Sequence, residues 1–142
     1  MSSEQKGVWI ELAVTVSVYV FYAFAVLGEV RRSSWAQADY VPLMLWTIAA
    51  SIAATVIVRT VVAAISPKDA GKRDIRDRQI YRFGEYAGRW AVIAGALGGL
   101  VLATLRVEPF WIANEIYLAF FISAVVAGIA KLIGYRRGVP AW

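Results

Sequence analysis

Four long apolar segments, separated by short polar stretches, dominate the pattern of hydrophobic and polar positions along the chain. They cover residues 9–28, 41–65, 86–105 and 110–135. A helix needs about 20 residues to cross the roughly 30 Å hydrocarbon core of a bilayer, and each segment reaches that length. Lipid offers no hydrogen-bond partner to an exposed backbone, so such segments are helical. The pattern predicts an all-α integral membrane protein, a four-helix transmembrane bundle that occupies residues 1–142 as a single domain.

The longest polar segment lies between the second and third spans, over residues 66–85. Its first part contains Pro67 and Gly71, which favour a loop. From Asp74 onward no helix breaker occurs before Gly84, and Asp precedes Arg in the order that the helix dipole favours. We expect a helix that begins at about Asp74 and continues into the third span. A short interfacial helix with a bend at Gly84 is the alternative.

Composition agrees with a membrane protein and excludes several classes of function. The chain is 60% hydrophobic and 18% charged, and it contains no Cys and no His. A soluble domain is usually about half apolar and a quarter charged. Without Cys or His, one chain cannot form a disulfide, a zinc finger, a haem axial His or a His-dependent catalytic triad. The remaining Ser, Asp, Glu, Lys and Tyr show no catalytic spacing, so we expect no enzyme activity, no metal and no cofactor.

The basic residues are distributed unevenly between the two sides of the predicted bundle. With the N-terminus in the cytoplasm, Arg31, Arg32 and Arg106 lie outside and eleven basic residues lie inside, Arg59 being set aside. Cytoplasmic loops carry the excess of Lys and Arg in membrane proteins. We therefore expect a multi-pass cell membrane protein with both termini in the cytoplasm, and the net charge of +5 indicates no nucleic-acid partner. The eleven are Lys6, Lys68, Lys72, Arg73, Arg76, Arg78, Arg82, Arg89, Lys131, Arg136 and Arg137.

The first functional hypothesis concerns the charged residues of the predicted cytoplasmic loop. Asp74, Arg76, Asp77 and Arg78 lie on the only sizeable loop of that side. Basic residues beside a membrane bind anionic lipid, and mixed charges can bind a protein. The hypothesis is a small non-enzymatic membrane protein whose loop contacts a cytoplasmic partner or the lipid bilayer surface.

Ionisable residues inside the spans give the alternative function. Such a residue costs about 3 kcal/mol at the centre of a span, so it is a functional candidate by default. Glu11 and Arg59 lie at similar depths in the first and second spans, where an ion pair or snorkelling of Arg59 to the headgroups would satisfy them. Asn114 and Glu115 lie in the outer part of the fourth span. An oligomeric small transporter or channel would use Glu115, Asn114 and Arg59.

Glu115 itself has two interpretations. As an unpaired carboxylate inside a span, it would bind a cation or a proton. Alternatively, it pairs with Arg106 or Arg31, which lie near the same side of the membrane, or is hydrated at the outer boundary.

Small residues form a stripe along the third span. They recur at steps of four, three, four and three residues, which is one helical face, and a GxxxG pair lies at its end. Small residues let two helices approach closely in lipid. The stripe predicts either a homodimer through the third span or packing against the fourth span, where Ala119, Ser123 and Ala127 form a matching ridge. The stripe consists of Gly84, Gly88, Ala91, Gly95, Gly98 and Gly99.

Three short motifs in the second half of the chain carry a resemblance to a known family. They are Asp74-Ile75-Arg76-Asp77 with Ile80, Gly84 and Gly88 behind it, Phe110-Trp111-Ile112-Ala113-Asn114, and Tyr135-Arg136-Arg137. The chain resembles an uncharacterised family of small bacterial four-helix integral membrane proteins. These proteins have an Asp-Glu-Arg-Asp-like motif in the cytoplasmic loop before the third helix, and Ile75 stands where that motif has Glu. The resemblance implies four spans and a bacterial inner membrane, and it implies no particular activity.

Overall fold

Four long helices form the architecture, and the computed structural model describes residues 3–65 and 75–139. Within these residues there is no strand, and each helix is long and apolar enough to cross a membrane. The predicted all-helical fold with four candidate spans is therefore confirmed. The helices are α1 (Ser3–Arg32), α2 (Val41–Ile65), α3 (Ile75–Thr104) and α4 (Pro109–Arg137).

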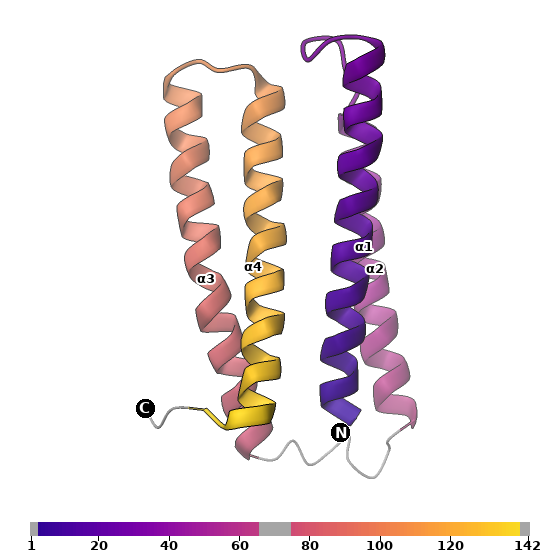
Figure 1. Ribbon diagram of the computed structural model, residues 1–142, viewed down its shortest axis with the longest axis vertical. Helices are drawn as coiled ribbons and strands as arrows, with labels where there is room; N and C mark the ends of the chain where they lie inside the picture. Colours follow the sequence, from indigo (N-terminus) through magenta and orange to yellow (C-terminus); the bar gives the residue numbers. More distant parts are fainter. Residues whose placement is uncertain (1–2, 66–74, 140–142) are drawn as a thin grey trace.

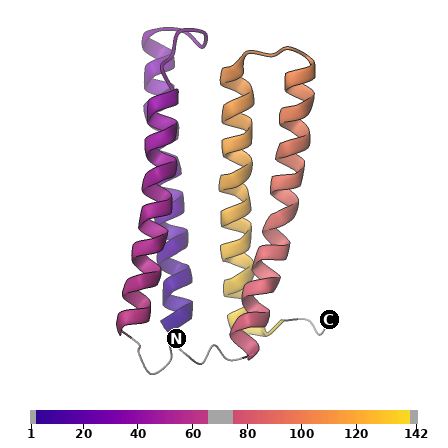
Figure 2. The same ribbon diagram turned by 180° about the vertical axis from the view of Figure 1, so that it is seen from behind.

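The helices are arranged as two antiparallel hairpins that stand side by side (Figure 1). The first hairpin consists of α1 and α2 and the second of α3 and α4, and α1 also packs against α4. Figures 1 and 2 show the start of α1 and the end of α4 at the same end of the molecule, here called the terminal end. The loops 33–40 and 105–108 lie at the opposite, distal end.

The third helix is already formed at Ile75, the first described residue after the loop. α3 is one continuous helix of 30 residues from Ile75, so the helix that follows the loop continues into the span. At about 1.5 Å per residue it is about 45 Å long, well beyond the roughly 30 Å hydrocarbon core. At the distal end Arg106 has a positive φ of 55°, and the chain resumes as α4 at Pro109. Proline suits this first turn because it has no N–H to leave unpaired.

The closest helix contact is the one between α3 and α4. Gly84, Gly88, Gly95 and Gly99 are buried in it. A Cβ added at Gly88 would lie 2.7 Å from the carbonyl oxygen of Ser123, which is too close for any side chain. The glycine face of α3 is thus occupied by α4 of the same chain. A homodimer through α3 would have to use the other side of this helix.

A cluster of aromatic side chains joins the two hairpins in the distal half. Tyr22 is only 2% exposed and meets Tyr117 edge-on, with the ring centroids 4.8 Å apart. Tyr19 stacks on Phe121 at a centroid distance of 4.0 Å. In contrast, Trp46 is 76% exposed, as are many large apolar side chains on all four helices. Such an apolar surface is typical of a protein that lies in a membrane.

Candidate functional site

The polar residues inside the candidate spans lie in three separate places. Glu11 and Arg59 lie in the terminal half, Asn114 is turned towards α1, and Glu115 is turned towards α3. The structure does not bring Arg59, Asn114 and Glu115 together. An oligomeric transporter or channel, the alternative function, would therefore use three separate positions in each chain.

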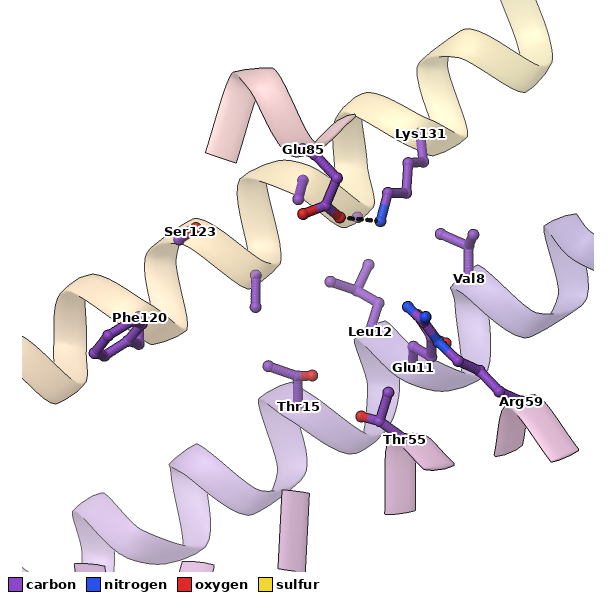
Figure 3. Close-up of a pocket in the computed structure, with 13 residues that line it drawn as sticks. Val8, Glu11, Leu12, Thr15, Thr55, Arg59, Glu85, Phe120, Ser123 and Lys131 are labelled. Carbon is purple, nitrogen blue, oxygen red and sulfur yellow. Dashed lines mark hydrogen bonds and ion pairs between the residues drawn. The ribbon is translucent and has the colours of Figure 1, made fainter. Parts of the chain in front are cut away.

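Two ion pairs cross helix interfaces in the terminal half. Arg59 Nε of α2 lies 2.9 Å from Glu11 Oε1 of α1, so the expected contact between these residues is present. Lys131 Nζ of α4 lies 2.7 Å from Glu85 Oε1 of α3 (Figure 3). Each pair neutralises a charge that would otherwise be costly inside a span.

Tyr81 connects the two ion pairs. Arg59 Nη2 donates a long hydrogen bond of 3.4 Å to the Tyr81 hydroxyl, and Lys131 Nζ lies 4.1 Å from the centroid of the Tyr81 ring. A cation over a tyrosine ring is attracted by about 0.5–2 kcal/mol. Glu11, Arg59, Tyr81, Glu85 and Lys131 together form what we call the charge network. Each of the four helices contributes one or two side chains to this network.

Lys131 is the most buried charge of this network. The residue is 6% exposed, whereas the Glu85 side chain is 51% exposed. A buried ammonium without a partner is strongly unfavourable, so the contacts with Glu85 and Tyr81 stabilise the Lys131 side chain in this position. Glycine makes room for it, because a Cβ at Gly84 would run into the Lys131 side chain.

A cavity of about 320 Å³ lies next to the charge network. Side chains of all four helices line it, and Figure 3 shows them pointing into the space between the hairpins. Its charged wall consists of Glu11, Arg59, Glu85 and Lys131. Cavities of at least about 300 Å³ are large enough for small ligands.

Asn114 links α1 to α4. The Tyr22 hydroxyl donates to Asn114 Oδ1 at 2.8 Å, and Asn114 Nδ2 donates to the Phe110 carbonyl oxygen at 2.8 Å. Near it, the Tyr117 hydroxyl donates to Thr47 Oγ1 at 3.1 Å, which fastens α4 to α2. The arrangement gives Asn114 a structural role in the helix contact.

Glu115 lies against the glycines of α3. Its Oε2 atom is buried without a hydrogen-bond partner, and a Cβ at Gly98 would lie 2.5 Å from its Oε1 atom. Within the described part of the chain it forms no ion pair, so the predicted pairing with Arg106 or Arg31 is wrong. The reason is helical geometry: neighbouring residues point about 100° apart, so Asn114 faces α1 while Glu115 faces α3.

The structure describes three of the four residues of the predicted cytoplasmic contact. Asp74 lies outside the described residues. Arg76 Nη2 donates to the Tyr135 carbonyl oxygen at 3.3 Å, which ties the start of α3 to the end of α4. Arg78 is exposed and Asp77 is half-buried, both in the first turns of α3. These residues lie at the terminal end.

From the sequence alone, Tyr81 and Glu85 were not candidates for a functional site, and Lys131 was counted only among the basic residues of the cytoplasmic side. The spacing does contain a signal. Lys131 continues the ridge of Ala119, Ser123 and Ala127 at a step of four residues, and Glu85 follows Gly84 of the small-residue stripe. Once α3 packs on this ridge, the two charges are placed together.

We compared the chain with protein-family models, with curated proteins and with solved structures, and none of the three comparisons gave a match. The resemblance to the small bacterial membrane proteins therefore stays a prediction that rests on its short motifs.

Proposed function

We propose that the chain is a non-enzymatic multi-pass protein of the cell membrane whose terminal end lies in the cytoplasm and binds anionic lipid headgroups. The observation that carries this proposal is a set of six exposed basic residues at or near the terminal end. None of them forms an ion pair within the described residues. The six are Lys6, Arg76, Arg78, Arg82, Arg136 and Arg137.

The distal end differs in its charge balance. Arg31, Arg32 and Arg106 lie there, with a similar number of acidic residues. Each Lys or Arg beside an anionic leaflet contributes about 1 kcal/mol of attraction, so the two ends would differ clearly in their affinity for such lipid. The positive-inside rule places the basic end in the cytoplasm. The acidic residues are Glu29, Asp39 and Glu108.

The proposed orientation is tested by cysteine labelling, since the chain has no Cys of its own. We expect a membrane-impermeant maleimide to label Gly138→Cys in inside-out vesicles only. Gln37→Cys, on the distal loop, should be labelled in right-side-out vesicles only. The reverse pattern would contradict the orientation, and with it the proposed access of the basic end to cytoplasmic lipid.

Lipid binding is tested in nanodiscs of mixed phosphatidylcholine and phosphatidylglycerol, with the lipids that remain bound counted by native mass spectrometry. The double variant Arg78→Gln/Arg82→Gln should retain fewer phosphatidylglycerol molecules, because two contacts of about 1 kcal/mol each are removed. The matched control is Arg31→Gln/Arg32→Gln at the distal end, which should retain as many as the unchanged protein.

Equal retention in the two double variants would show that the basic end has no lipid preference. The same residues would then be free to contact a cytoplasmic protein, which was the other form of the hypothesis. In that case Asp77 would matter as much as Arg78, whereas lipid binding predicts that Asp77→Asn leaves retention unchanged or raises it.

A second candidate function, transport of a proton or cation by an oligomer, is favoured by one observation. Glu115 is a carboxylate with a buried, unpartnered oxygen inside a candidate span. In the transport reading, proton or cation flux in proteoliposomes is lost in Glu115→Gln and kept in Glu108→Gln, which changes an exposed residue of the distal loop. Flux that is the same in both variants would exclude Glu115 from any pathway.

The unpartnered oxygen also makes a prediction about stability. Glu115→Met should raise the free energy of unfolding by about 1–3 kcal/mol, because it removes a buried polar atom that has no partner and keeps the length of the side chain. Unfolding can be followed by circular dichroism in a titration with sodium dodecyl sulfate. Glu108→Met is the matched control and should change little. Destabilisation by Glu115→Met would show that the carboxylate has a stabilising partner.

A further inference from the structure

The cavity between the hairpins changes in character along its length. Its charged wall lies towards the terminal end, where Glu11, Arg59, Glu85 and Lys131 approach one another. One to three helical turns further from that end, the lining consists of hydroxyl groups and apolar side chains. These are Thr15, Thr55, Phe120, Ser123 and Ala124.

We propose that this cavity binds a small zwitterion that carries an apolar group, such as an amino acid with an apolar side chain. The ammonium group of the ligand would contact Glu11 or Glu85, and its carboxylate would contact Arg59 or Lys131. The apolar group would lie against Phe120 and Ala124. This site is distinct from the exposed basic residues of the lipid proposal.

The charges of the lining argue for a zwitterion. Two carboxylates and two cations face the cavity, so its charged wall is neutral as a whole. A ligand with a positive charge alone would draw a carboxylate away from Arg59 or Lys131 and leave that cation uncompensated, and an anion would do the reverse. This cost falls mainly on Lys131, which is 6% exposed, because an uncompensated buried charge costs several kcal/mol. A zwitterion brings both signs and keeps every charge paired.

The volume argues for a small ligand. About 320 Å³ corresponds to roughly ten molecules of liquid water and lies at the lower limit of ligand pockets. An amino acid of the size of phenylalanine fits this space. The change from charges to apolar side chains also gives the ligand one orientation, with its charged end towards the terminal end.

Phenylalanine is the probe that tests the proposal, with the intact protein in nanodiscs of phosphatidylcholine and phosphatidylglycerol. We expect saturable binding of radiolabelled phenylalanine. Phenylalanine methyl ester, which keeps only the ammonium, and N-acetylphenylalanine, which keeps only the carboxylate, should compete at least about tenfold more weakly, the change expected for about 1.4 kcal/mol. No saturable binding, or equal competition by all three compounds, would overturn the proposal.

A matched pair of variants locates the site. Thr15→Phe places a large side chain into the cavity and should abolish the binding of phenylalanine. Val16→Phe makes the same change at the next position, which is 37% exposed and does not line the cavity, and should leave binding unchanged. Circular dichroism checks that both variants fold. Unaltered binding in a folded Thr15→Phe variant would place the ligand elsewhere and overturn the assignment of the cavity.

A last experiment distinguishes a free zwitterion from a lipid headgroup as the ligand of the cavity. Phosphatidylethanolamine also carries an ammonium and an acidic group. Nanodiscs that contain it should bind phenylalanine as well as those without it. Displacement of phenylalanine by this lipid would assign the cavity to a lipid headgroup and overturn the proposal. The phosphatidylglycerol experiment on Arg78 and Arg82 is unaffected by either result, so the two proposals fail independently.

Discussion

Gly95→Ala should lower the free energy of unfolding by about 1–3 kcal/mol, the usual cost of an overpacked contact. The added methyl group would occupy the place of the Ala119 Cβ atom, which belongs to the facing helix. Neither atom can turn away, because both are fixed to helix backbones. The helices α3 and α4 must therefore separate locally and lose the close contact that holds them in lipid. Titration with sodium dodecyl sulfate, followed by circular dichroism, measures the change.

Two further variants decide whether the loss comes from this contact. Ala119→Gly in the Gly95→Ala background moves the methyl group from one helix to the other and should restore most of the stability. Gly28→Ala adds a methyl group to α1 where nothing lies within 4 Å. It should be neutral or stabilise by up to about 1 kcal/mol, since Ala favours a helix over Gly. A Gly95→Ala variant as stable as Gly28→Ala would show that α3 and α4 are not packed as described.

Glu85→Leu is the second change with a large expected effect, a loss of about 2–3 kcal/mol. It removes the carboxylate from Lys131, which stays buried with the Tyr81 ring as its remaining partner. Breaking a fully buried pair costs about 3–5 kcal/mol, and the half-exposed position of Glu85 lets water compensate in part. The same unfolding titration measures the loss.

The double variant Glu85→Leu/Lys131→Met supplies the control for this prediction. It replaces both charges by apolar groups and should recover most of the loss, because no charge is left without a partner. Glu11→Leu should cost less than Glu85→Leu, since the side chain of Arg59 is 49% exposed and can extend to the headgroups. A larger effect of Glu11→Leu than of Glu85→Leu would show that Arg59, and not Lys131, is the more buried of the two cations.

The extents of the helices could be predicted from the sequence with few errors. The bounds of α2 agree with the apolar segment 41–65, and α3 is helical from Ile75, the first described residue after the loop. Both follow from local signals: a long, largely apolar segment in one case, and the order of Asp and Arg after a loop in the other. The small-residue stripe also identified the face of α3 that packs on a neighbour, because only glycine permits such an approach.

The contacts between side chains were harder to predict, for a physical reason. A helix that is apolar on all sides has no polar face to show how it is rotated about its axis. The sequence therefore did not separate Asn114, which faces α1, from Glu115, which faces α3. Glu11 and Arg59 were the exception, because each is the only charge within its own predicted span and their depths agree. Lys131 and Tyr81 offered no such uniqueness.

The placement of the two ion pairs also bears on how the chain enters a membrane. Glu11 and Arg59 both belong to the first hairpin, and Glu85 and Lys131 both belong to the second. During synthesis, each hairpin therefore carries its own counter-charge and can leave the translocation machinery already neutral at that depth. The Glu85–Lys131 pair can form before the first hairpin packs against the second. Within the charge network, the contacts between Arg59 and Tyr81 form after both hairpins have met.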